Sequence, residues 1–303
     1  MRFGSSRGAG APKNGSPYAP RVAVDLGSSR IRISLPDRRV LIDRPSSFPD
    51  EPEGEAAVSA RALQRRRIDR NAWVDSLPEG WVCPIQHGMV TDAGACARLT
   101  SQTLREAAVK LPPGEVLLAL PSTAGDRDRQ RAVSAMRAAA DCAVRTMEAP
   151  LAAAIGAGHT IDDPEPRLVM DIGAGLAEMA VIEEGRVVRK RSVAYRLEQP
   201  PGSPTPRLPS RTHTRVVEEL QRLLDDLPSR SRTAVRLRGM LLTGGGALLP
   251  SLPGSLVLPL SLNVRIAPDP ARATIRGLAR VCLAPAPVRE AVTSPAAASP
   301  ALR

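Results

Sequence analysis

The chain has 303 residues, too many for one small module, so its length predicts two lobes of ordinary size. Apolar residues make up 43% of the chain and aromatic residues only 2%, which predicts an aliphatic core and disfavours recognition of single-stranded nucleic acid by aromatic stacking. The formal net charge is +11, but the basic residues are spread along the chain as on an ordinary solvated surface. Nucleic acid is therefore a disfavoured partner.

Both ends of the chain are poor in residues that a core can bury. Residues 1–21 and 284–303 are rich in small residues and proline, and each segment is predicted to be a disordered tail. A proline-rich segment at 199–213 lacks apolar periodicity and is predicted to be a surface loop. An arginine-rich run at 61–70 is interpreted as an exposed helix face, with a patch for a partner or for lipid headgroups as the alternative.

Between the tails, short apolar strands alternate with helical stretches. In chain order the expected elements are strands at 22–26, 31–35 and 40–42, a helix over 91–110, a strand at 116–119, helices over 126–143 and 150–158, strands at 168–172, 177–182 and 187–192, a helix over 214–227 and a strand at 240–243. The last helix has Val216, Leu220 and Leu224 on one face. This alternation is typical of an α/β protein.

The cysteines and histidines predict neither a metal site nor a redox centre. They are scattered without paired spacing, so we interpret all of them as packing or surface residues: Cys83, Cys96, Cys142, Cys282, His87, His159 and His213. The sequence has no apolar run long enough to cross a membrane and no apolar segment near its start, which predicts a cytoplasmic protein with reduced thiols. Peripheral membrane association stays open, because a partner can supply it.

Two segments of the chain look like copies of one another. Val22–Ser29 and Leu168–Gly175 are each an apolar strand that ends in Asp, an apolar residue, Gly and further small residues. Such a turn leaves backbone N–H groups free to bind an anion, and an Asp at the end of the strand can hold a hydrated Mg²⁺ beside phosphates. One copy alone is typical of an ordinary turn, whereas two copies predict duplicated lobes that face each other across a cleft.

A third glycine-rich segment, Leu241–Leu249, follows another apolar strand. Its three adjacent glycines allow a flat ligand or a phosphate to lie against the backbone, although each glycine costs entropy to order. A flexible turn is the alternative interpretation. The three segments together favour a nucleotide-binding clamp.

At this point the sequence resembles a known family. Four motifs occur in the order and context of the bacterial actins of the MreB/Mbl rod-shape group: Asp25–Ser29, Glu148–Gly158, Asp171–Gly175 and Leu242–Leu249. Further matches are Ile85–Asp92, Leu120–Ser122 and Val264–Pro270, so the resemblance covers residues 20–283. It implies the duplicated two-lobe α/β fold of actin, which is ribonuclease H-like, with a first lobe at 22–145 and a second at 146–283. Sugar kinases, heat-shock chaperones and pilus-assembly proteins of this fold share only the hairpins.

The resemblance also implies a ligand and the residues that bind it. Members of the group bind ATP with Mg²⁺, polymerise into membrane-associated filaments and guide wall synthesis, so the implied partners are other bacterial actin paralogues and the cell-wall synthesis machinery. The implied phosphate-binding residues are Gly27, Ser28, Ser29 and Arg30 from the first lobe and Gly173, Ala174, Gly175 and Leu176 from the second. The implied metal residues are Asp25 and Asp171, and the implied adenosine-binding residues are Gly244, Gly245, Gly246, Ala247 and Leu248.

The chain departs from the family pattern in two functional motifs. Where the second hairpin of the family reads Asp-Ile-Gly-Gly-Gly-Thr-Thr, this chain has Ala174, Leu176 and Ala177, which predicts weaker nucleotide binding. Where the family has a catalytic glutamate before a proline, this chain has Ala149. Loss of a positioned base typically costs about 10²–10⁴ in rate. Glu148 is the candidate replacement for this base, and a surface or helix-capping carboxylate is the alternative interpretation.

The largest departure is a deletion. In the family, the strand that ends near Arg191 leads into an outer subdomain, but here only the segment 199–213 stands in its place. We therefore expect an actin-like fold with one outer subdomain deleted. Two functions remain: a nucleotide-binding protein of cell shape or cell-wall organisation that is at most a weak ATPase, and a pseudo-ATPase scaffold that binds protein partners without polymerising or hydrolysing ATP.

Overall fold

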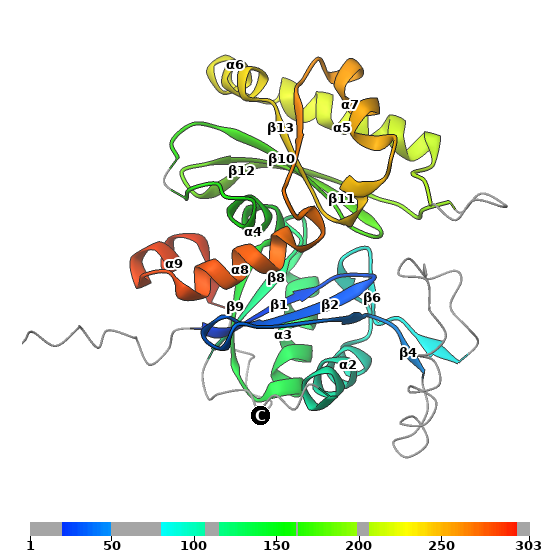
Figure 1. Cartoon of the computed structure of the whole chain (residues 1–303), viewed down its shortest axis with the longest axis vertical. Helices are drawn as coiled ribbons and strands as arrows, with labels where there is room; N and C mark the ends of the chain where they lie inside the picture. The colour runs from blue at the N-terminus through cyan, green and yellow to red at the C-terminus, as the bar shows by residue number, and fades with distance from the viewer. Residues whose placement is uncertain (1–19, 50–79, 107–114, 162, 199–205, 296–303) are drawn as a thin grey trace, which may run out of the picture.

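The computed structural model describes residues 20–49, 80–106, 115–161, 163–198 and 206–295. These residues form two lobes, each built on its own β-sheet, with helices packed between the sheets (Figure 1). Most of the predicted N-terminal tail lies outside the described residues. So does the arginine-rich run at 61–70, which was interpreted as an exposed helix face. Within the described part of the chain, no helix is long and apolar enough to span a membrane.

The first lobe contains a six-stranded sheet in the order β15-β9-β8-β1-β2-β3. Its strands are β1 (Pro20–Leu26), β2 (Arg30–Leu35), β3 (Val40–Pro45), β8 (Glu115–Leu120), β9 (Ala143–Glu148) and β15 (Ser294–Pro295). Strand β1 pairs antiparallel with β2 and parallel with β8. Helices α2 (Ala93–Glu106) and α3 (Asp126–Ala140) bury apolar side chains against one face of this sheet, Leu99 and Met136 among them.

Among its described residues, the first lobe also contains four very short strands and a 3₁₀ turn. They are β4 (Phe48–Pro49), β5 (Trp81–Val82), β6 (Ile85–Gln86), β7 (Met89–Val90) and η1 (Pro36–Arg38). Strands β6 and β7 form a hairpin whose turn is His87 and Gly88, both with positive φ.

The second lobe repeats this architecture. Its five-stranded sheet has the order β12-β11-β10-β13-β14, with β10 (Arg167–Ile172), β11 (Leu176–Glu183), β12 (Arg186–Ala194), β13 (Met240–Thr243) and β14 (Val264–Ile266). Strand β10 pairs antiparallel with β11 and parallel with β13, as β1 does with β2 and β8. The duplication predicted from the two hairpins is confirmed.

Three helices cover the outer face of the second sheet. They are α5 (Ser210–Asp225), α6 (Ser229–Arg238) and α7 (Leu252–Leu260), and they share one apolar core with the sheet. The 3₁₀ turns η3 (Gly245–Leu248) and η4 (Pro270–Arg272) lie at the end of the lobe that faces the cleft.

Two helices lie between the sheets, and each follows one sheet in the chain but packs on the other. Helix α4 (Ala149–Gly156) follows β9 of the first sheet but packs on β10 of the second, and α8 (Ala273–Leu283) follows the second sheet but packs on β1 of the first. They cross at Gly156 and Gly277, where an added Cβ would lie 1.8 Å from Ala273 O and 1.7 Å from Ala152 O respectively. This close backbone contact fixes the two lobes relative to each other.

The structure differs from the expected lobe boundaries in three places. The boundary expected at 145/146 falls within β9, and α8, expected in the second lobe, covers the first sheet. The disordered tail expected from residue 284 is wrong for 286–295, which form α9 (Ala286–Val292) and β15. The reason is that Val292 and Arg289 are buried and β15 pairs with β9.

The proline-rich connection between β12 and α5 is short. Helix α5 begins at Ser210, so the loop expected over 199–213 ends earlier than predicted. A β-bridge between Glu198 and Arg207 closes this connection, and only residues 199–205 of it lie outside the described part. The connection has no room for a subdomain.

Candidate functional site

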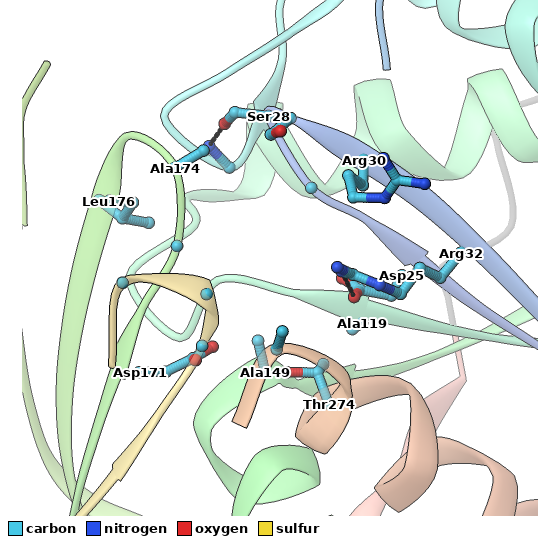
Figure 2. Close-up of a pocket in the computed structure, with 18 of the residues that line it drawn as sticks. Asp25, Ser28, Arg30, Arg32, Ala119, Ala149, Asp171, Ala174, Leu176 and Thr274 are labelled. Atoms are coloured by element: carbon cyan, nitrogen blue, oxygen red, sulfur yellow. Dashed lines mark hydrogen bonds and ion pairs between the residues drawn. The ribbon is translucent and has the colours of Figure 1, made fainter. Parts of the chain in front are cut away.

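The two predicted hairpins border the same cavity. The turn after β1 and the turn after β10 open from opposite lobes onto a cavity of about 760 Å³, within the size range of small-molecule sites (Figure 2). Gly27 N donates to Arg30 O at 3.1 Å, and Gly173 N donates to Leu176 O at 2.8 Å, so the two turns have the same hydrogen-bonding pattern.

Most of the predicted phosphate-binding residues line this cavity. The lining residues are Gly27, Ser28, Ser29 and Arg30 from the first hairpin and Gly173, Ala174 and Leu176 from the second. Gly175 is not among the lining residues. Its carbonyl oxygen accepts a hydrogen bond from Tyr195 N at 2.9 Å and lies 2.8 Å from His87 Nδ1.

The glycine-rich segment after β13 reaches the cavity too, but two of its glycines have a packing role. An added Cβ on Gly244 would lie 2.2 Å from Ile172 O, and one on Gly246 would lie 2.2 Å from Ile172 Cγ2. Gly245 has nothing within 4 Å of its Cβ position and borders the cavity, as does the exposed Leu248. Ala247 is buried in the core of the lobe and does not line the cavity.

The two aspartates at the strand ends point into the cavity from opposite lobes (Figure 2). Burial raises the pKa of Asp171 to about 6, although Thr243 Oγ1 donates to its Oδ1 at 3.0 Å, and the charge of Asp25 raises this pKa further. Burial also raises the pKa of Asp25, against the lowering effect of Arg32. The structure therefore brings together the acidic pair that the sequence predicted.

Arginine side chains pair with Asp25 and with the neighbouring Asp43. Arg32 Nη1 donates to Asp25 Oδ2 at 3.3 Å, and Arg32 Nε lies 3.4 Å from Asp43 Oδ2. Arg30 also binds Asp43, with Nη2 2.9 Å from its carbonyl oxygen, and Arg272 Nε lies 3.5 Å from Asp43 Oδ2. Although burial raises the pKa of Asp43, these guanidinium groups bring it below its usual value. All five residues line the cavity.

The family is settled by comparison with known proteins. A family model described as MreB/Mbl protein matches residues 19–196 and 209–287. The chain belongs to the MreB/Mbl family. The break in the match falls on the short connection between β12 and α5.

Individual relatives agree with this assignment. The cell shape-determining protein MreB of Pasteurella multocida (strain Pm70) is 24% identical over 324 residues, which covers 86% of this chain and 92% of the relative. That alignment is longer than the chain itself, so it contains gaps in this chain. The structure of MreB5 of Spiroplasma citri bound to AMPPNP has a TM-score of 0.66 at 18% identity and covers 84% of this chain and 93% of that one. The MamK double helical filament has a TM-score of 0.64 at 15% identity and covers 87% and 99%. The two structures show that the fold is actin-like.

In this MreB/Mbl-family chain, the residues around Asp25 do not fit the Mg²⁺ that the resemblance implied. A hydrated divalent cation needs a free carboxylate, but Asp25 is already paired with Arg32. Among the residues that the structure describes, no group of three His, Cys, Asp or Glu side chains is placed to hold a metal ion.

The start of α4 does not present a carboxylate to the cavity. Ala149 lines the cavity at the family's glutamate position (Figure 2), whereas Glu148 does not line it. Glu148 Oε1 accepts a hydrogen bond from Lys190 Nζ at 3.1 Å, and Glu148 makes no capping hydrogen bond to α4. The side chain of Glu148, the candidate base, is therefore paired with Lys190 and does not border the cavity.

Glu178 is an acidic residue of the cavity that was not predicted from the sequence, as are Asp43 and Asp269. Glu178 on β11 lies opposite Asp171 in the β10–β11 register and is 4% exposed. Its Oε1 accepts hydrogen bonds from Ser122 N at 2.6 Å and Ser122 Oγ at 2.9 Å. Burial raises the pKa of Glu178 to about 8, and the charge of Asp171 contributes. A lone carboxylate within the apolar run 176–182 was the available signal, since buried acids need partners.

The turn between β6 and β7 connects the two hairpins. Gly88 N donates to Ser28 Oγ at 2.8 Å, and His87 Nδ1 lies 2.8 Å from Gly175 O. His87 therefore contacts the opposite lobe at the end of the cavity formed by the hairpins. The interpretation of His87 as an isolated packing or surface residue missed this contact, because it depends on a tertiary neighbour 88 residues away.

Proposed function

We propose that this protein binds an adenine nucleotide in the cavity between its lobes and acts in cell-shape or cell-wall organisation, with weak or absent ATP hydrolysis. One observation carries the proposal: the turns after β1 and β10 have the same hydrogen-bonding pattern and open onto one cavity from opposite lobes. Two comparisons support it. The MreB5 structure of the same fold was solved with AMPPNP, and the P. multocida relative is named for cell-shape determination.

The cavity has the chemistry that a nucleotide requires. Glycine and serine turns can approach phosphate oxygens closely, and the guanidinium groups of Arg30 and Arg32 supply positive charge and fork-shaped donors for them. At another part of the cavity, Gly245 and Leu248 offer an open, apolar surface for an adenosine group.

Weak hydrolysis follows from the carboxylates near the reaction centre. Ala149 presents only a methyl group, and Glu148 is paired with Lys190. Glu178 borders the cavity, but its Oε1 already accepts two hydrogen bonds from Ser122. No carboxylate at the start of α4 is therefore available to orient an attacking water.

The proposal is tested by calorimetric titration of ATP into the full chain and two matched variants. Gly245→Leu fills the cavity without disturbing a neighbour, because nothing lies within 4 Å of its Cβ position. Gly254→Leu is the control, since Gly254 is equally unobstructed but lies on α7 outside the cavity. We expect Gly245→Leu to weaken ATP binding at least about tenfold and Gly254→Leu to leave it unchanged. Equal binding by all three proteins would refute the assigned site.

A scaffold that binds protein partners without polymerising is the second candidate. The short connection between β12 and α5 favours it, because the missing subdomain supplies filament contacts in the family that the chain resembles. Its partners would be MreB/Mbl paralogues or the cell-wall synthesis machinery. Electron microscopy of the purified protein with ATP separates the two: filaments support the cytoskeletal function, and ATP binding without filaments supports the scaffold.

A further inference from the structure

Arg32 occupies an unusual position for a charged residue. It lies between Ile31 and Ile33 in strand β2, directly opposite Asp25 in the β1–β2 register, so that both side chains are on the same face of the sheet. The two side chains are only 13% and 16% exposed, and both border the cavity (Figure 2). A buried arginine placed beside the acid at the end of β1 supplies a fixed positive charge at that point.

The guanidinium group of Arg32 is only partly satisfied by the protein. Its Nη1 donates to Asp25, but its buried Nε has no hydrogen-bond partner, with the nearest Asp43 oxygen at 3.4 Å. Asp43 is shared with Arg30 and Arg272, and Arg272 Nη1 also lies 3.8 Å from Asp269 Oδ2, so three guanidinium groups meet three carboxylates at this end of the cavity. The buried Nε–H group of Arg32, which no carboxylate accepts, is therefore a donor that an anion can use.

We propose that Arg32 takes the place of the divalent cation beside Asp25, so that the cleft binds the polyphosphate group of a nucleotide without metal. This inference rests on the proposed nucleotide-binding function. An arginine suits the role because its guanidinium stays charged and forms paired hydrogen bonds with phosphate oxygens, whereas a metal ion would have to displace the Arg32–Asp25 ion pair.

The test is the affinity of the full chain for ATP, measured by calorimetry in excess EDTA and in excess Mg²⁺. For the wild type we expect the two dissociation constants to agree within about threefold, a difference of less than one charge-assisted hydrogen bond. Arg32→Leu should weaken binding in EDTA at least about tenfold and should make binding depend on Mg²⁺, because Asp25 is then free.

Two further variants test whether the position of the positive charge and the fork shape of the guanidinium group matter for ATP binding. Arg127→Leu removes the same charge from the exposed surface of α3, outside the cavity, and should leave both affinities unchanged. Arg32→Lys keeps the charge but not the fork, and should bind ATP in EDTA with an affinity between those of the wild type and Arg32→Leu. Arg32→Lys also tests the inference if the leucine variant does not fold.

The outcomes distinguish a failure of this inference from a failure of the proposed function. Wild-type binding that requires Mg²⁺ would overturn this inference and leave the proposed function intact. Undiminished binding by Arg32→Leu in EDTA would likewise show that Arg32 is not the counterion of the phosphates. Absence of ATP binding in both buffers would overturn the proposed function and this inference together.

Discussion

The crossing of α4 and α8 determines how firmly the two lobes are joined, and Gly277→Ala tests it. The added methyl group would lie 1.7 Å from Ala152 O and 2.6 Å from its carbonyl carbon. Because the obstacle is helix backbone, no side-chain rotation relieves the clash, and the helices must separate. The core between the lobes, which includes Leu151 and Leu278, then loses contacts.

The expected cost of Gly277→Ala is about 3 kcal/mol of unfolding free energy, the upper end of the range for overpacked cores. Urea denaturation followed by circular dichroism measures it. Gly254→Ala is the matched control, because Gly254 lies on the exposed side of α7 with nothing within 4 Å of its Cβ position, and it should be neutral or up to about 1 kcal/mol more stable. A Gly277→Ala variant within about 0.5 kcal/mol of the wild type would refute the close crossing.

Three further predictions concern the cavity. Because burial raises the pKa of Glu178 from 4.5 to about 8, the folded chain holds a proton that the unfolded chain releases, so stability should fall as pH rises through this interval, by at most about 3 kcal/mol at pH 7. Glu178→Gln should reduce this slope in urea denaturation, most of all above pH 6, because Asp171, with a pKa raised to about 6, contributes to the slope at lower pH; an unchanged slope would contradict the assignment. Ala149→Glu should raise phosphate release from ATP at least about tenfold, whereas Glu148→Gln should not lower it; the opposite result would make Glu148 the base. Ala174→Gly removes a methyl group from the phosphate turn and should tighten ATP binding a few-fold in calorimetry, and weaker binding would contradict this role.

The paired hairpins could be predicted because their signal is local. Strands β1 and β10 are apolar runs that end in Asp-x-Gly, and a strand followed by a tight turn needs no information from the rest of the chain. The three adjacent glycines were also visible in the sequence, and all three line the cavity, but the sequence did not show that Gly244 and Gly246 are also required by the close approach of Ile172.

Several elements could not be predicted because tertiary contacts decide them. Strand β9 begins at Ala143, where helical periodicity extended the preceding helix, and α6 buries only Val235 and so has little apolar pattern. The roles of Arg32 and Glu178 could not be predicted for the same reason. Each is a charged residue with apolar neighbours on both sides in its strand, and its role depends on which carboxylate or hydroxyl it contacts in the folded chain.

The central claim is that both lobes bind one nucleotide, and hydrogen–deuterium exchange with and without ATP tests it most directly. ATP should slow exchange of the backbone amides in both hairpins, at 27–30 and 173–176, and in the turn at 244–248. Protection of only one hairpin, at an ATP concentration that saturates binding, would contradict the account, because a nucleotide held between the lobes must contact both.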